Sequence, residues 1–131
     1  MDKNSLARIS IGIVILHVVI TFAHGIAHTN LFIAMSLLQN IYISLVILAG
    51  PIVAAVFLRK NPKVGFGILA ASMLGSFLFG VYYHFIVISS DNVFTLDDRP
   101  WSMTFQLTAV LLAIIEFAGT GIGLLGTFAQ D

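Results

Sequence analysis

The stretch Ile11–His28, IGIVILHVVITFAHGIAH, decides what kind of protein this chain is. It is an almost unbroken apolar run, close to the roughly 20 residues that a helix needs to cross a bilayer. Three histidines interrupt it, at positions 17, 24 and 28. At about 100° per residue, His24 and His28 lie within roughly 20° of His17 around a helix, so the three imidazoles form one stripe. Because an ionisable ring is costly in lipid, we expect this stripe to face the protein interior.

The composition of the whole chain agrees with a membrane protein. Of the 131 residues, 59% are hydrophobic and only 9% are charged, whereas about 25% of a soluble domain is charged. The net charge is +0, so no basic surface for a nucleic-acid partner is expected. The absence of cysteine excludes disulfides, thiolate metal sites and iron–sulfur clusters.

The apolar runs predict an all-α fold, an integral membrane bundle of four transmembrane helices that forms a single domain over residues 1–131. The expected helices cover residues 6–28, 39–58, 64–88 and 103–128, with connecting loops at 29–38 and 89–102. Pro51 lies in the middle of the second helix, where it removes a backbone hydrogen bond and should kink the helix.

The positive charges predict the orientation of this bundle. Arg99 falls on one side of a four-helix topology, and the other side holds Lys3, Arg8, Arg59, Lys60 and Lys63. The positive-inside rule then places both termini in the cytoplasm and the loops 29–38 and 89–102 outside. We therefore expect a multi-pass protein of the plasma membrane or an equivalent membrane.

Small residues predict how the helices pack, because they let transmembrane helices approach closely. Such residues follow one another on the third and fourth helices: Ser72, Ser76, Gly80, Gly119, Gly121, Gly123 and Gly126. The second helix carries Asn40 and Ser44 near its outer end. We expect the polar groups of all four helices to converge on one interior.

Counting about 1.5 Å per residue along each helix predicts two polar layers. His84 lies four residues from the outer end of the third helix, at a depth similar to that of His24 and close to that of His28. Glu116 lies roughly 20 Å down the fourth helix, which brings it to the depth of His17. The outer layer therefore holds three histidines, and the middle of the membrane holds a carboxyl group and an imidazole.

The outer layer has the composition of a metal site. His24 and His28 are four residues apart on one helix, so both can bind one ion, and His84 supplies a third imidazole. Three neutral nitrogens suit copper or zinc. A b-type haem with His24 and His84 as axial ligands is an alternative cofactor. The remaining interpretation is that the rings only form hydrogen bonds around a small polar cavity. The overlying loop offers acidic residues that add an oxygen ligand or orient a ring: Asp91, Asp97 and Asp98.

The middle layer has its own chemistry. An unpaired buried carboxylate is expensive, so Glu116 should be protonated or paired, with His17 as its partner. A neutral hydrogen bond between them would lock the first helix to the fourth. Alternatively, the pair and the histidine stripe form a proton relay.

Three functions follow from these features. One is a small subunit that carries a metal ion or haem. Another is an accessory subunit of a larger membrane complex, such as a copper-dependent oxygenase, without catalytic activity of its own. The alternative is a proton-coupled small transporter or channel that uses Glu116 and the histidine stripe. The expected partners are the lipid bilayer and either other membrane subunits or further copies of this chain. A hydrolase of the soluble type is disfavoured, because no nucleophile elbow is evident.

Overall fold

The computed structural model describes residues 2–129, and within this range the chain is helical with no strand. The elements in chain order are α1 (Lys3–Asn30), α2 (Leu37–Tyr42), the π-helix η1 (Ile43–Ala49), α3 (Gly50–Lys60), α4 (Pro62–Val81), the π-helix η2 (Tyr82–Ile86) and α5 (Ser102–Phe128). They form four continuous helical stretches that are long and apolar enough to cross a membrane: Lys3–Asn30, Leu37–Lys60, Pro62–Ile86 and Ser102–Phe128. The predicted all-helical architecture is confirmed, and it fits a multi-pass membrane protein.

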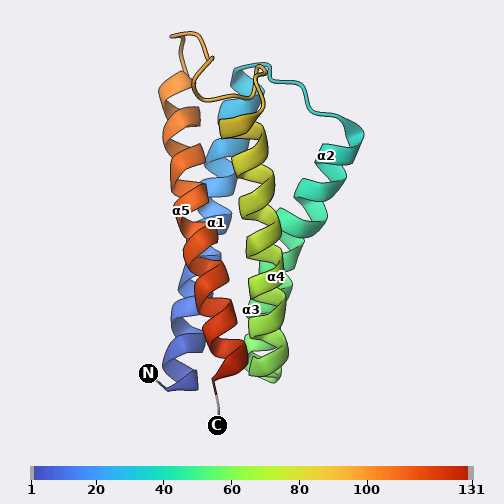
Figure 1. Ribbon diagram of the computed structural model, residues 1–131, viewed down its shortest axis with the longest axis vertical. Helices are drawn as coiled ribbons and strands as arrows, with labels where there is room; N and C mark the ends of the chain where they lie inside the picture. Colours follow the sequence, from blue (N-terminus) through green and yellow to red (C-terminus); the bar gives the residue numbers. More distant parts are fainter. Residues whose placement is uncertain (1, 130–131) are drawn as a thin grey trace.

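The long helices form an elongated bundle (Figure 1). α4 packs against both α3 and α5, and α5 also packs against α1. Both ends of the described chain lie at one end of the bundle, together with the junction between α3 and α4 (Figure 1). The loop between η2 and α5 covers the opposite end. The two ends of the bundle are therefore chemically different, since one carries the basic turn (residues 59–63) and the other the acidic loop (residues 87–101).

The second helical stretch changes its winding just before the proline. η1 occupies Ile43–Ala49, and Pro51 stands at the start of α3. Proline cannot donate a backbone hydrogen bond, and its ring crowds the carbonyl four residues earlier. The wider turn of a π-helix makes room for the ring. Figure 1 shows the result: α3 runs within the bundle, whereas α2 stands away from it.

The glycines of α5 bring this helix close to α4. A Cβ added at Gly123 would lie only 2.6 Å from the backbone nitrogen of Ala70, and one at Gly119 would lie 2.9 Å from Cγ of Met73. The predicted close packing through these two residues is therefore confirmed. Gly121 has open space beside it instead, because it lies on the other side of the helix.

The buried apolar side chains form three clusters along the bundle. The first consists of Ala27, Leu31, Ile33, Val93, Phe105 and Ala109, the second of Val14, Ala54, Leu69 and Met73, and the third of Leu6, Leu58 and Phe66. The first cluster includes Val93 of the loop after η2, so this loop is packed onto the bundle rather than projecting from it.

Two sequence expectations are wrong. Asn40 and Ser44 do not join a common interior: both are exposed, and their side chains donate to the carbonyls of Ser36 and Asn40 in their own helix. The reason is that α2 leans away from the other helices. The third helical stretch also ends at Ile86 rather than at residue 88, because Val87 adopts an extended conformation.

Candidate metal centre

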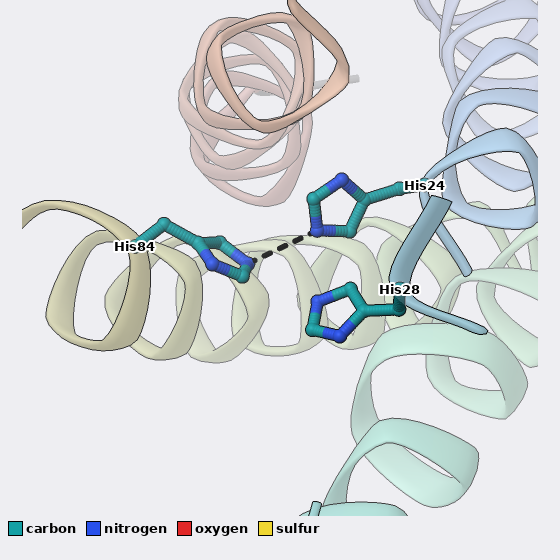
Figure 2. A group of neighbouring side chains, drawn as sticks. All are labelled: His24, His28 and His84. Atoms are coloured by element: carbon teal, nitrogen blue, oxygen red, sulfur yellow. Dashed lines mark hydrogen bonds between the residues drawn. The ribbon is translucent and has the colours of Figure 1, made fainter. Parts of the chain in front are cut away.

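Three histidines meet near the loop-covered end of the bundle. His24 and His28 come from α1, and His84 comes from η2. All three are buried, and one ring nitrogen of each lies within 4.8 Å of the others. Figure 2 shows the three rings pointing towards one another from the two elements. The structure thus brings together the three residues that the sequence singled out, in an arrangement that could hold a metal ion.

Local structure places each ring. The four-residue spacing of His24 and His28 puts both on one face of α1, with ring centroids 4.9 Å apart. His84 lies within the short π-helix η2, a kind of turn that is frequent at functional sites. Directly after it the chain folds back, and the backbone N–H of Val93 donates to the carbonyl of His84 over 3.0 Å. This loop closes the outer side of the cluster.

The hydrogen-bond acceptor next to His84 determines which of its ring nitrogens carries the hydrogen. Its Nδ1 lies 3.1 Å from the backbone carbonyl oxygen of Asp91. A carbonyl only accepts, so Nδ1 must carry the hydrogen and donate. In the neutral ring, Nε2 then holds a lone pair. That lone pair faces Nε2 of His24 at a distance of 3.2 Å (Figure 2).

The orientation of the Thr108 hydroxyl determines which ring nitrogen of His24 carries the hydrogen. Its Oγ1 lies 2.8 Å from Nδ1 of His24 and 2.7 Å from the carbonyl oxygen of Thr104. When the hydroxyl donates to Thr104, it accepts from Nδ1–H of His24, and the lone pairs of His24 and His84 face each other. Only a shared proton or a metal cation makes that contact favourable. When the hydroxyl instead donates to His24, Nε2–H of His24 donates to His84. Two tautomers of His24 are thus compatible with these contacts: in one, Nε2–H donates to His84, and in the other, the lone pair of Nε2 could bind a cation.

One acidic residue of the loop contacts the cluster. Oδ1 of Asp91 lies 3.1 Å from Nε2 of His28 and 3.2 Å from Nδ1 of His84. These are ion-pair distances without the alignment of a side-chain hydrogen bond. Burial acts to raise the pKa of Asp91, but the contacts with His28 and His84 outweigh it and hold the pKa well below its ordinary value. Asp97 and Asp98, which the sequence offered as equivalent, are exposed on the loop.

Two further residues of α5 complete the surroundings, and neither was singled out from the sequence. The ring of Phe105 is fully buried and stacks on His24, with centroids 4.7 Å apart. Thr108 makes the hydrogen bond described above. The sequence does contain an indication of Phe105, because it lies eleven residues before Glu116 and therefore on the same face of a helix. Counting depth from the start of α5 would have put Phe105 and Thr108 level with the histidines.

The second polar layer is also formed. Nε2 of His17 lies 3.1 Å from Oε1 of Glu116, and both side chains are buried. The hydroxyls of Thr21 and Thr120 are bonded to the backbone carbonyls of His17 and Glu116, so they are not partners of the carboxyl group. Nδ1 of His17 is buried without a hydrogen-bond partner. The expected contact between α1 and α5 through this pair is present.

A cavity of about 80 Å³ connects the two layers. Its lining includes Glu116 as well as His24, His28 and His84. His17 contacts Glu116 but is not one of the lining residues.

Comparisons of this chain with protein-family models, with curated proteins and with solved structures found no match. The side chains of the site are therefore the basis on which its function is inferred.

Proposed function

We propose that this chain is a small multi-pass membrane protein that binds one transition-metal ion through His24, His28 and His84, as the metal-bearing subunit of a larger membrane complex. The observation that carries the proposal is the convergence of three buried imidazole nitrogens within 4.8 Å. Two nitrogens bound to one zinc ion are at most about 4 Å apart, since each bond is about 2.0–2.1 Å long. Small rotations of the side chains would therefore complete the site.

The partners of the other ring nitrogens support metal binding. A metal-binding histidine usually donates its second N–H to a carbonyl, carboxylate or other acceptor, which fixes the ring and its tautomer. His84 has such a partner in the carbonyl of Asp91, and His24 has one in the hydroxyl of Thr108. The carboxylate of Asp91 adds a negative charge next to the cluster, which favours a bound cation.

A single ion of copper or zinc fits the site better than a haem. Three neutral imidazoles are ligands that both metals accept. A haem would need its iron and macrocycle between two axial ligands, but Nε2 of His24 and Nε2 of His84 are only 3.2 Å apart. The adjoining cavity of about 80 Å³ is also far smaller than the roughly 300 Å³ or more of a typical cofactor pocket.

The small size of the chain supports a role as a subunit. The four spanning stretches take up most of the described residues, and the cavity beside the histidines is small, so little of a substrate could be bound there by this chain alone. A membrane-bound oxidoreductase, such as a copper-dependent oxygenase, is one class of complex that would use such a subunit.

We further propose that both termini are cytoplasmic and that the metal centre lies at the outer face, because the basic turn and the chain ends share one end of the bundle.

Elemental analysis of protein extracted in mild detergent without chelator tests this proposal. We expect about one copper or zinc ion per chain, and its loss in His84→Ala. Tyr82→Ala is the matched control, because Tyr82 is an exposed residue of the same η2 element. A mass of the intact assembly well above that of one chain would support the role as a subunit. Wild-type protein that neither contains nor takes up copper or zinc would overturn the metal proposal.

A second candidate function is proton-coupled transport, which the buried pair of His17 and Glu116 favours. Glu116 lines the cavity, and the neighbouring imidazole has an unpartnered nitrogen that could pass on a proton. Glu116→Gln should then abolish proton-coupled flux in reconstituted vesicles, while metal content stays unchanged. Equal flux in wild type and Glu116→Gln would reject this candidate.

A further inference from the structure

The cavity beside the histidines has the size of a very small molecule. It lies between α1, η1, α4 and α5, and its volume is about 80 Å³. A water molecule takes about 30 Å³ in the liquid, so this volume suits a guest of about two to four heavy atoms. Lipid chains and ordinary metabolites are too large to enter as a whole.

Most of the wall of this cavity is hydrocarbon. The apolar residues that line it include Ile43, Ile47, Phe79, Ala109, Leu112 and Ala113. A charged guest would lose its hydration in these surroundings without equivalent compensation. A bound metal cation at the histidines would also repel a second cation. The wall therefore selects an uncharged guest.

The hydroxyl groups in the wall are already satisfied. Thr21 donates to the carbonyl of His17 over 2.8 Å, and Ser76 donates to the carbonyl of Ser72 over 2.8 Å. The polar atoms of the lining that remain without a partner belong to His28, and the carboxyl group of Glu116 borders the space. The polar groups available to a guest are therefore at the histidines and at Glu116, and most of the remaining wall is apolar.

Gly80 keeps the cavity open between the two polar layers. A Cβ at this position would lie 3.7 Å from Oε2 of Glu116 and 3.9 Å from Cδ2 of His84. The missing side chain thus leaves space that touches both the carboxyl group and a histidine of the cluster. A methyl group would fit there in ordinary contact and fill part of the space.

We infer that this cavity is a chamber for one small uncharged molecule, which binds next to the metal ion. The inference rests on the proposed metal site: three protein ligands leave a coordination position for an outside ligand, as in catalytic metal centres. The guest molecule, the cavity and the metal ion then form one site, with Glu116 at its edge.

Xenon and carbon monoxide are suitable probes, because both are small and uncharged. Xenon pressure would be varied over detergent-solubilised protein while the alanine methyl signals of Ala109 and Ala113 are recorded by NMR. Carbon monoxide would be added to protein loaded with copper(I), and its stretching band recorded by infrared spectroscopy. The variants are Gly80→Ala and Ala113→Leu, and the matched control is Gly121→Ala, which points into open space.

We expect saturable xenon shifts and a copper-bound carbon monoxide band in wild type and Gly121→Ala. The shifts should weaken in Gly80→Ala and disappear in Ala113→Leu, with metal content unchanged in each. Protein that retains its metal but shows no saturable xenon shift would overturn the chamber and leave the metal proposal standing. Protein that shows saturable xenon shifts but takes up no metal would overturn the metal proposal, and with it the claim that the guest binds next to a metal ion.

Discussion

At the scale of single residues, the hydroxyl of Thr108 decides which form of His24 is present. It can accept from Nδ1–H of His24 only while its own hydrogen points to a carbonyl of its own helix, that of Thr104 or that of Phe105. That arrangement leaves Nε2 of His24 unprotonated, as a metal ligand must be. A residue that never touches the ion thus prepares one of its three ligands.

Thr108→Val should weaken metal binding without removing it. The valine keeps the shape of the side chain but cannot accept from His24, so we expect the dissociation constant to rise about 10- to 100-fold. Competition with a chromophoric chelator measures it. Thr108→Ser should bind nearly as tightly as wild type, and Thr127→Val is the control, since the hydroxyl of Thr127 is bonded only to its own helix. Equal affinity in wild type and Thr108→Val would show that this hydroxyl has no role in preparing His24.

His17→Ala should destabilise the fold strongly. It leaves the carboxyl group of Glu116, which is only 3% exposed, without the imidazole 3.1 Å away. Removing one partner of a buried pair costs about 3–5 kcal/mol. Unfolding in mixed micelles, followed by circular dichroism, measures this loss. The double variant His17→Ala/Glu116→Gln should lose less than the sum of the two single variants; strictly additive losses would contradict a coupled pair.

At the scale of elements, the glycine face of α5 sets its distance from α4. Gly123 packs against the backbone of Ala70, where no flexible side chain can move aside. Gly123→Ala should therefore lower the free energy of unfolding by about 1–3 kcal/mol, the usual cost of overpacking. The matched variant Gly121→Ala adds the same methyl group into open space and should leave stability close to that of wild type. Similar melting temperatures for both variants would contradict close packing at Gly123.

The whole molecule has two chemically different ends, and this difference predicts its orientation. The chain contains no cysteine, so single cysteines can be introduced without a background. Lys60→Cys lies in the basic turn and Asp98→Cys in the acidic loop, and both positions are exposed. In intact cells, a membrane-impermeant maleimide should label Asp98→Cys, whereas Lys60→Cys should react only after permeabilisation. Labelling of Lys60→Cys in intact cells would reverse the proposed topology.

Features that depend on one helix at a time could be predicted from the amino-acid sequence. Apolar runs of about 20 residues predict spanning helices, because the bilayer sets their length. The spacing of His24 and His28 predicts one face, because helix geometry is regular. Counting residues also placed His84 level with His24, since neighbouring spans begin near the same surface.

The groups that complete the site depend on contacts between elements and could not be predicted in this way. Asp91 contacts the histidines and Asp97 and Asp98 do not, because the loop after η2 folds back onto the bundle, and loop paths follow no simple period. Thr108 was missed for a related reason: a threonine in a helix normally bonds its own backbone, and only the packing of α5 against α1 brings it to His24. The two kinds of feature differ in the separation along the chain over which they are determined. Helical periodicity is set locally by backbone geometry, whereas the partners of a histidine ring depend on contacts between elements far apart in the chain.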